Sequence, residues 1–245
     1  MVFNYSGRTD KGPRNINEDG FKCIVKDDAL FLIVLDGLGI EDESKGIPAS
    51  SLVLTHLEWF IQDFYNKKLN MEDFLKELFF LGNTIVQNCK YANKEVYLNY
   101  GASLLICALK DNRKLTFANV GNNRLYLIRK NNLFQGSIDD NEASDLLKKG
   151  KITKEEYETH EGRNKLTNGL GFNKKISPYV QTIVAEKEDL VILVTDGVYR
   201  VLGDERMKQL IIESGELDTS TDWLLKGVNE VGAVDNMTAI VSYIN

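Results

Sequence analysis

Short apolar runs and amphipathic stretches alternate along the 245-residue chain. Runs rich in Val, Ile, Leu, Phe and Tyr predict β-strands at residues 20–26, 30–36, 102–110, 114–120, 123–129, 179–185, 190–196 and 238–244. Apolar positions at helical spacing predict helices at residues 48–65, 71–91, 204–213 and 220–231. This order of elements favours an α+β layered fold with antiparallel sheets over a parallel, doubly wound sheet.

Turn signals between the central strands indicate antiparallel hairpins. Asp111-Asn112-Arg113 separates two of the predicted strands, and Asn119-Val120-Gly121-Asn122-Asn123 separates the next two. Asn and Gly are the residues that tight hairpin turns favour. The sequence has no internal repeat and no Pro/Gly-rich linker, so we expect one domain over residues 1–245.

The segment from about 134 to 171 is more polar than its surroundings. Thr153 followed by Glu156 predicts a capping box at the start of a short helix. Short polar helices linked by glycine are typical of a surface excursion, and we interpret this segment as a flap inserted over a site.

Composition excludes several classes of function. The chain is 43% hydrophobic and 27% charged, which is ordinary for a soluble globular protein. Its net charge of −6 argues against nucleic-acid binding. No apolar run approaches the roughly 20 residues needed to cross a bilayer, so no membrane association is expected. The three unclustered cysteines, Cys23, Cys89 and Cys107, predict a reducing, cytoplasmic location.

Four acidic motifs are spread over the chain: Asn17-Glu18-Asp19, Asp36-Gly37, Asp196-Gly197 and Asp235-Asn236. A single Asp-Gly pair is usually a plain turn, but two of these pairs each end a strongly apolar strand. Converging carboxylates repel one another unless a cation holds them, which predicts a site for a hard divalent metal. With two histidines and no CxxC pair in the chain, zinc is disfavoured, and Mg²⁺ or Mn²⁺ is expected.

Arg14 lies five residues before Asp19 and is a candidate for binding an anion. Its planar guanidinium suits the oxygens of a phosphate group beside a metal site. The alternative is a surface arginine paired with Glu18 or Asp19.

Other reactive side chains have simpler interpretations. Cys107 and Arg113 match the Cys-x5-Arg spacing of thiol phosphatases, but Cys107 lies inside an apolar strand and no Gly-rich loop opens a helix there, so we interpret it as a buried structural cysteine. His56 is interpreted as a partly buried or surface helical residue and His160 as solvent-exposed. The acidic run Glu41-Asp42-Glu43 is interpreted as a solvated loop.

Taken together, the motifs resemble the type-2C (PPM) family of metal-dependent Ser/Thr protein phosphatases, in particular its bacterial single-domain members. The matching segments follow the order of the family's motifs over essentially the whole chain: Gly12–Asp19, Leu35–Gly39, Gly101–Leu104, Ala118–Tyr126, Leu166–Gly171, Thr195–Val198 and Asp235–Thr238.

The resemblance implies a four-layer α-β-β-α sandwich with two central antiparallel sheets flanked by helices. It also implies two metal ions, Mn²⁺ or Mg²⁺, at one edge of that sandwich. Asp36 would bridge both ions and the Gly37 carbonyl would bind one of them. Asp196 and Asp235 would hold the other ion.

The resemblance further implies that Glu18 and Asp19 orient metal-bound waters or bind the metal directly, and that Arg14 clamps the phosphate. A hydroxide bridging the two ions would attack phosphorus in line, with no covalent enzyme intermediate. The expected substrate is a phosphoserine or phosphothreonine protein, modified by an opposing Ser/Thr kinase, and the enzyme is expected to be a cytoplasmic monomer.

Two of the departures from the family pattern bear on activity. Asn122 stands where the family has an aspartate that binds a third metal ion, and a neutral amide is a weaker ligand for a hard cation, so the third ion is expected to be weakened or lost. Ile40 replaces the second glycine of the motif around Asp36. These departures leave an alternative open: a phosphoprotein-binding pseudophosphatase or a weakly active regulator.

Overall fold

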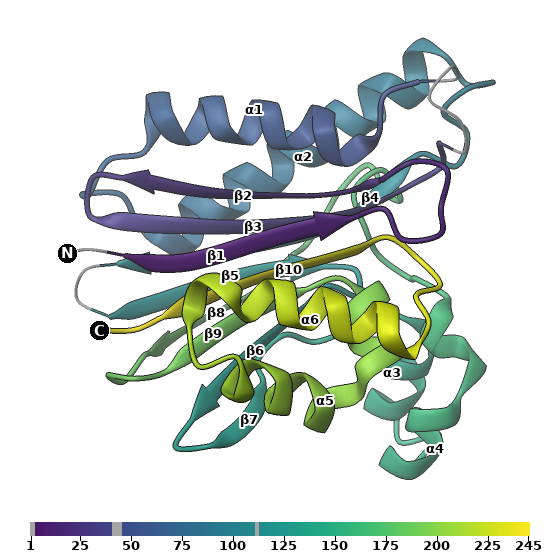
Figure 1. The fold of residues 1–245 in the computed structure, drawn as a ribbon. Coiled ribbons are helices and arrows are strands. Elements are labelled where there is room, and N and C mark those ends of the chain that lie inside the picture. The colour runs from purple at the N-terminus through teal and green to yellow at the C-terminus, as the bar shows by residue number, and fades with distance from the viewer. Residues whose placement is uncertain (1–2, 41–45, 111–112) are drawn as a thin grey trace.

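Two five-stranded antiparallel sheets form the centre of the computed structural model, which describes residues 3–40, 46–110 and 113–245 (Figure 1). The first sheet contains, in spatial order, β1 (Asn4–Asp10), β10 (Met237–Tyr243), β9 (Leu190–Val194), β6 (Arg124–Arg129) and β7 (Asn132–Gln135). The second contains β2 (Asp19–Lys26), β3 (Ala29–Leu38), β4 (Gly101–Lys110), β5 (Lys114–Val120) and β8 (Tyr179–Val184).

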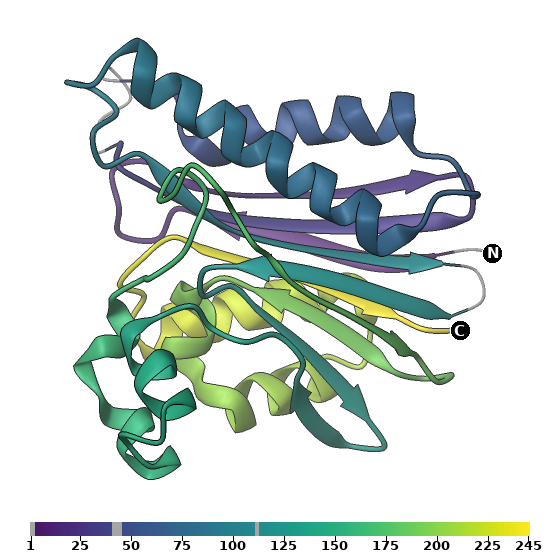
Figure 2. The ribbon, with the colours of Figure 1, turned by 180° about the vertical axis from the view of Figure 1, so that it is seen from behind.

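Helices cover the outer face of each sheet, as the two opposite views show (Figures 1 and 2). The second sheet carries α1 (Ala49–Phe64) and α2 (Met71–Ala92), and the first carries α5 (Asp196–Glu213) and α6 (Leu217–Val231). The shorter α3 (Glu142–Lys148), α4 (Lys154–Thr159) and η2 (Glu161–Asn164) lie between β7 and β8. The predicted four-layer sandwich is confirmed.

Strand β3 shows why the sheets stack. Successive side chains of a strand point to opposite faces, and here both faces are buried. Leu30, Leu32 and Val34 belong to the core between the two sheets. Phe31 and Ile33 belong to the core under α1 and α2. A strand buried on both faces is a continuous apolar run, which is the pattern that made this strand predictable.

The predicted hairpin between β5 and β6 is wrong. Strand β5 pairs with β4 and β8, whereas β6 pairs with β7 and β9 in the other sheet. The intervening segment therefore crosses from one sheet to the other. The buried amide of Asn123 holds the crossing, because its Nδ2 donates to the carbonyls of Val34 and Ser103, each at 3.2 Å. Local turn residues do not reveal a bond to a distant strand.

Three further elements differ from the sequence expectation. Helix α5 begins at Asp196 rather than at residue 204, and it is kinked at Gly203, whose φ of 69° lies outside the helical region. Strand β1 was not predicted, because its burial depends on pairing with β10 at the far end of the chain. Strand β7 is short and largely exposed, so its apolar signal is weak.

Other expectations concern single turns. The capping box at Thr153 and Glu156 is confirmed at the start of α4. The turn residues Asp111 and Asn112 and the acidic run Glu41-Asp42-Glu43 lie outside the described residues.

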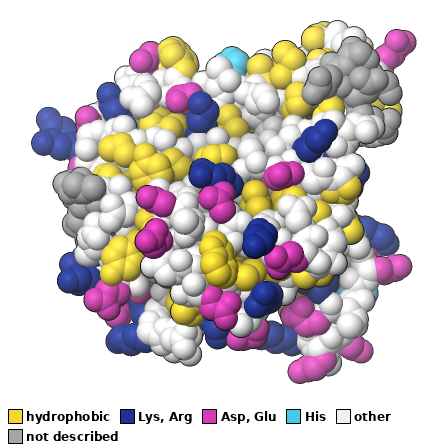
Figure 3. Space-filling model, in the orientation of Figure 1, with side chains coloured by type: hydrophobic (Ala, Val, Ile, Leu, Met, Phe, Trp, Pro, Cys, Tyr) yellow, Lys and Arg dark blue, Asp and Glu magenta, His cyan; other side chains and the backbone are white. Residues whose placement is uncertain are grey.

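Two further observations concern membranes and charged partners. Every helix in the described parts of the chain is too short or too polar to cross a membrane. On the face seen in Figure 3, acidic and basic side chains are interspersed rather than gathered by sign.

We expect Val34→Ala to lower the free energy of unfolding by about 2 kcal/mol, because it removes two methyl groups from the fully buried core between the sheets. The matched control is Val25→Ala on β2, where the side chain is 48% exposed, and its cost should stay below about 0.5 kcal/mol. Urea unfolding of both variants measures the difference. Equal losses would contradict the packing described for β3.

Candidate metal and phosphate site

Segments from both sheets meet around a cavity of about 500 Å³ at one end of the sandwich. Its lining includes Asp36, Asp196 and Asp235, together with Glu18 and Arg14. The connections β1–β2, β9–α5 and α6–β10 turn at this end, on the right of Figure 1. The structure therefore brings together side chains that lie up to 221 residues apart in the sequence.

Sheet register and helix position place the three aspartates. Asp36 lies near the end of β3, opposite Asp19 of β2 and Ser103 of β4. Asp196 is the first residue of α5, where the helix dipole favours a carboxylate. Gly197 lets this turn approach the loop before β10, because a Cβ at Gly197 would collide with the backbone carbonyl of Asn236.

Asn236 fixes the loop that carries Arg14 and Glu18. Its side-chain Nδ2 donates to the carbonyls of Lys11 and Ile16, at 2.8 and 2.9 Å. Its Oδ1 accepts from the backbone N–H of Glu18 at 2.8 Å. One buried amide thereby satisfies three backbone groups, and it sets the position of the β1–β2 loop against Asp235.

Glu18 and Asp19 have different surroundings. Glu18 lines the cavity, and its Oε1 accepts from the backbone N–H of Ile40 at 2.8 Å, so it braces the loop after Asp36. Asp19 is buried behind this lining, and its Oδ2 accepts the hydroxyls of Thr195 and Thr238 at 2.8 and 2.9 Å. Asp19 thus ties β2 to the strand ends of the other sheet.

The electrostatics of the site favour protons or cations. Burial raises the pKa of Asp36 well above its usual value, and the carboxylates of Asp196, Asp19 and Asp235 raise it further. Burial also raises the pKa of Asp19 to about 7, against the lowering effect of its two threonine hydrogen bonds. Within the described residues, no side chain donates a hydrogen bond to Asp36, so its charge is left for another partner.

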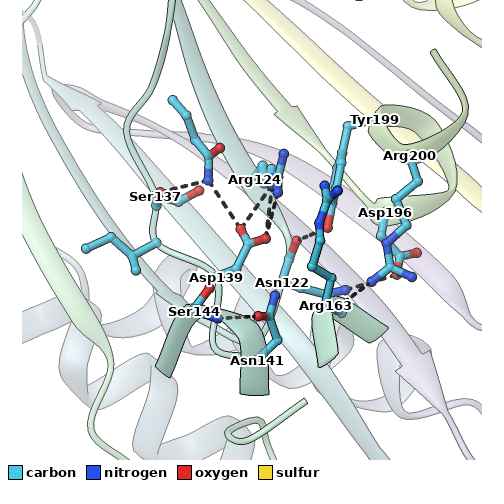
Figure 4. A network of polar contacts seen from close by, with 12 residues as sticks. Asn122, Arg124, Ser137, Asp139, Asn141, Ser144, Arg163, Asp196, Tyr199 and Arg200 are labelled. Atoms are coloured by element: carbon cyan, nitrogen blue, oxygen red, sulfur yellow. Dashed lines mark hydrogen bonds and ion pairs between the residues drawn. The ribbon is translucent and has the colours of Figure 1, made fainter. Parts of the chain in front are cut away.

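Two arginines contact the outer aspartates. Arg14 Nη2 lies 2.8 Å from Asp235 Oδ2 at the mouth of the cavity. Arg200 Nη1 lies 3.0 Å from Asp196 Oδ2, and Asn122 Nδ2 donates to that same oxygen at 2.9 Å. Figure 4 shows Asn122, Asp196 and Arg200 side by side.

The segment over residues 134–171, which the sequence predicts to be a flap, is attached beside the site by a buried polar network. Arg124 pairs with Asp139 at 2.8 Å, and both side chains are almost fully buried. Tyr157 of α4 donates to Asp139 at 3.1 Å. The Arg124 guanidinium also stacks on the ring of Tyr199 at 3.9 Å (Figure 4). This network connects the predicted flap to β6 and α5.

The donor set fits a hard dication. Carboxylate side chains line the cavity together with Gly37, and oxygen ligands are those that Mg²⁺ and Mn²⁺ prefer. Among the described residues, no three acidic, histidine or cysteine side chains are already gathered around one point.

The side chains set aside in the sequence occupy structural positions. Cys107 is buried and free, and burial raises the pKa of its thiol, which opposes thiolate chemistry. His56 lies exposed on α1 with Nδ1 2.8 Å from the Leu52 carbonyl. His160 is half-buried rather than exposed, and its Nδ1 accepts from the Gly162 N–H at 3.0 Å.

Sequence reasoning missed two contributors. Arg200 carried a usable signal, since a basic residue four positions after Asp196 on a helix lies on the same face. Asn236 was recognised as part of a motif, but its role depends on backbone groups more than 200 residues away and has no local signal.

Comparison with known proteins adds a second line of support. No family model matches the chain. The protein phosphatase PhpP of Streptococcus pneumoniae is 29% identical over 151 residues, which are 62% of this chain and 61% of PhpP. The serine/threonine phosphatase stp of Listeria welshimeri is 29% identical over 239 residues, 96% of this chain and 93% of that protein. The chain is therefore similar to a named bacterial serine/threonine phosphatase over nearly its whole length.

A solved phosphatase structure shows the same architecture. The catalytic domain of the serine/threonine protein phosphatase PstP, solved in complex with two manganese ions, superposes with a TM-score of 0.84 at 24% identity. The match covers 100% of this chain and 99% of that one. At this identity the likeness establishes the fold.

We expect the free energy of unfolding of the metal-free protein to fall as the pH rises from about 5 to 8. A carboxyl whose pKa is raised by folding holds its proton more tightly in the folded state. Its contribution is therefore present at low pH and is lost as the pH rises through the raised value. Asp36 and Asp19 both belong to this class.

Asp36→Asn should reduce this loss, because the amide does not ionise. Denaturant unfolding in the presence of a chelator, repeated across that pH range, measures the slope. The control Asp63→Asn, at an exposed position of α1, should keep the wild-type slope. If the unfolding free energy of Asp36→Asn changes with pH as steeply as that of the wild type, the electrostatic explanation given for Asp36 is refuted.

Proposed function

We propose that this protein is a Mn²⁺- or Mg²⁺-dependent phosphatase that hydrolyses phosphoserine and phosphothreonine in proteins. The observation that carries the proposal is the meeting of Asp36, Asp196 and Asp235 in one cavity with Arg14 at its mouth. The named relatives are themselves described as phosphatases.

In this proposal the chain holds two ions. Asp36 would be shared by both ions, and Gly37 would help to hold one of them. Asp196 and Asp235 would hold the other. Glu18 supports the site from the cavity wall and Asp19 from behind it, in keeping with their observed contacts. The two manganese ions in the PstP structure support this number.

Two bound dications would lower the pKa of water to supply a nucleophile and would neutralise charge on the phosphoryl group. Arg14 then binds the non-bridging phosphate oxygens, because its guanidinium is planar, always charged and more than half exposed at the mouth. Its contact with Asp235 positions it there before substrate arrives. No nucleophilic cysteine is required, in agreement with the buried, inert Cys107.

In this proposal the binding of a third ion is weakened in this chain. Asn122 directs its Nδ2 toward Asp196, and an amide N–H repels a cation rather than binding it. The proposed resting stoichiometry is therefore two ions per chain.

The expected substrate is a phosphorylated segment of another protein, made by an opposing Ser/Thr kinase. A second cleft, of about 1190 Å³, continues from the cavity between the flap and α5 and shares Asn164 and Arg200 with it. Tyr157 and Arg206 also line this cleft. An extended peptide laid in it places a phosphorylated side chain at the aspartates. None of the relatives named above supports a binding-only protein.

Hydrolysis of a phosphothreonine peptide should require Mn²⁺ and should stop in EDTA. Asp36→Ala should lower kcat by roughly a thousandfold or more, because several kcal/mol of transition-state stabilisation depend on the ions. Asp63→Asn is the control for an acidic residue lost from the surface.

Release of phosphate, measured with and without chelator, gives the answer. Full activity in EDTA would overturn the proposal. If calorimetry shows that the phosphopeptide binds in excess Mn²⁺ but no phosphate is released, the protein is instead a binding-only protein.

A further inference from the structure

Arg200 occupies an unusual place between the predicted metal site and the flap. It follows Asp196 by four residues on α5, so the two side chains share a helix face. One terminal nitrogen lies 3.0 Å from Asp196 Oδ2, and the other donates to the backbone carbonyl of Arg163 in η2 at 3.1 Å. The guanidinium is thus fixed at both ends (Figure 4).

Asn122 completes the same contact from the other side. Its Oδ1 accepts the hydroxyl of Ser103 at 2.8 Å, which sets the orientation of the amide. Its Nδ2 consequently points at Asp196 Oδ2 at 2.9 Å. Asn122 is 2% exposed, so this orientation is protected from water.

The two donors divide the Asp196 carboxylate into two faces. Oδ2 receives both Arg200 and Asn122. Oδ1 accepts no hydrogen bond within the described residues, so it would be available to help hold an ion.

Charge equivalence explains why Asn122 and Arg200 occur together. An aspartate holding a dication carries a net charge of one positive unit. An asparagine beside an arginine carries the same charge. The side chains at these two positions therefore carry the net charge that an aspartate with a bound dication would carry.

We propose that Arg200, oriented with Asn122, replaces the third metal ion as a built-in cation that positions Asp196 and joins the flap to the metal site. This inference rests on the proposed phosphatase function. Arg200 is a positioning residue, because it acts through Asp196 rather than on the substrate.

The first test counts ions. Calorimetric titration with Mn²⁺ alone should give two ions per wild-type chain. Asn122→Asp should still bind two, because the new carboxylate pairs with Arg200. The double variant Asn122→Asp/Arg200→Gln should bind three, because a carboxylate is gained and the competing cation is lost. Three ions in the wild type, or two in the double variant, would overturn the inference.

The second test separates catalysis from binding with a small aryl phosphate, which does not need the peptide cleft. Arg200→Gln should lower kcat by about 10- to 100-fold with KM nearly unchanged, a smaller loss than removal of a donor that touches the transition state. Arg200→Lys should retain part of the activity. Added guanidinium ion should restore part of the activity of Arg200→Ala.

The matched control is Arg8→Gln. Arg8 lies on β1, is exposed and pairs with Asp222 at 2.8 Å, so its loss removes the same charge away from Asp196. Its kcat should equal that of the wild type. If Arg200→Gln keeps the kcat of the wild type, the proposed role of Arg200 is refuted, whereas the phosphatase function is not. If the wild-type protein shows no activity in Mn²⁺, the phosphatase function is refuted. In that case the number of bound ions still decides the role of Arg200.

Discussion

Like-charged carboxylates packed together at one end of the sheet sandwich are the constraint on which the rest of the site depends. Asp19 and Asp36 face each other across neighbouring strands, and Asp196 and Asp235 complete the group from the other sheet. Burial and mutual repulsion raise the pKa of Asp36 and Asp19. Such a group is stable only with protons, hydrogen-bond donors or cations, and the surrounding residues supply the last two.

Neutral hydrogen bonds hold the acidic side chains and the loops around them in place. Two threonine hydroxyls hold Asp19, and the buried Asn236 amide holds the loop that carries Arg14. The crossing at Asn123 joins the sheets next to the cavity. Because these supports come from backbone and neutral side chains, the central carboxylate of Asp36 remains without a side-chain donor among the described residues, which suits a bridging ligand.

The sequence made the layers and the acidic motifs predictable, because buried strands are continuous apolar runs and helices repeat at their own period. It also indicated that Asp36, Asp196 and Asp235 belong to one site, through the order of their motifs. The crossing between β5 and β6 was misread, since a local turn signal does not specify which sheet the next strand joins. The contact of Arg200 was missed because helix α5 begins eight residues earlier than its apolar pattern suggested.

Crystals grown with Mn²⁺ and measured at the manganese absorption edge test the central claim most directly. The account predicts two anomalous peaks, roughly 3.5–4 Å apart. One peak should lie beside Asp36 and the Gly37 carbonyl, and the other should lie between Asp36, Asp196 and Asp235. A single peak, peaks away from Asp36, or none at saturating Mn²⁺ would contradict it.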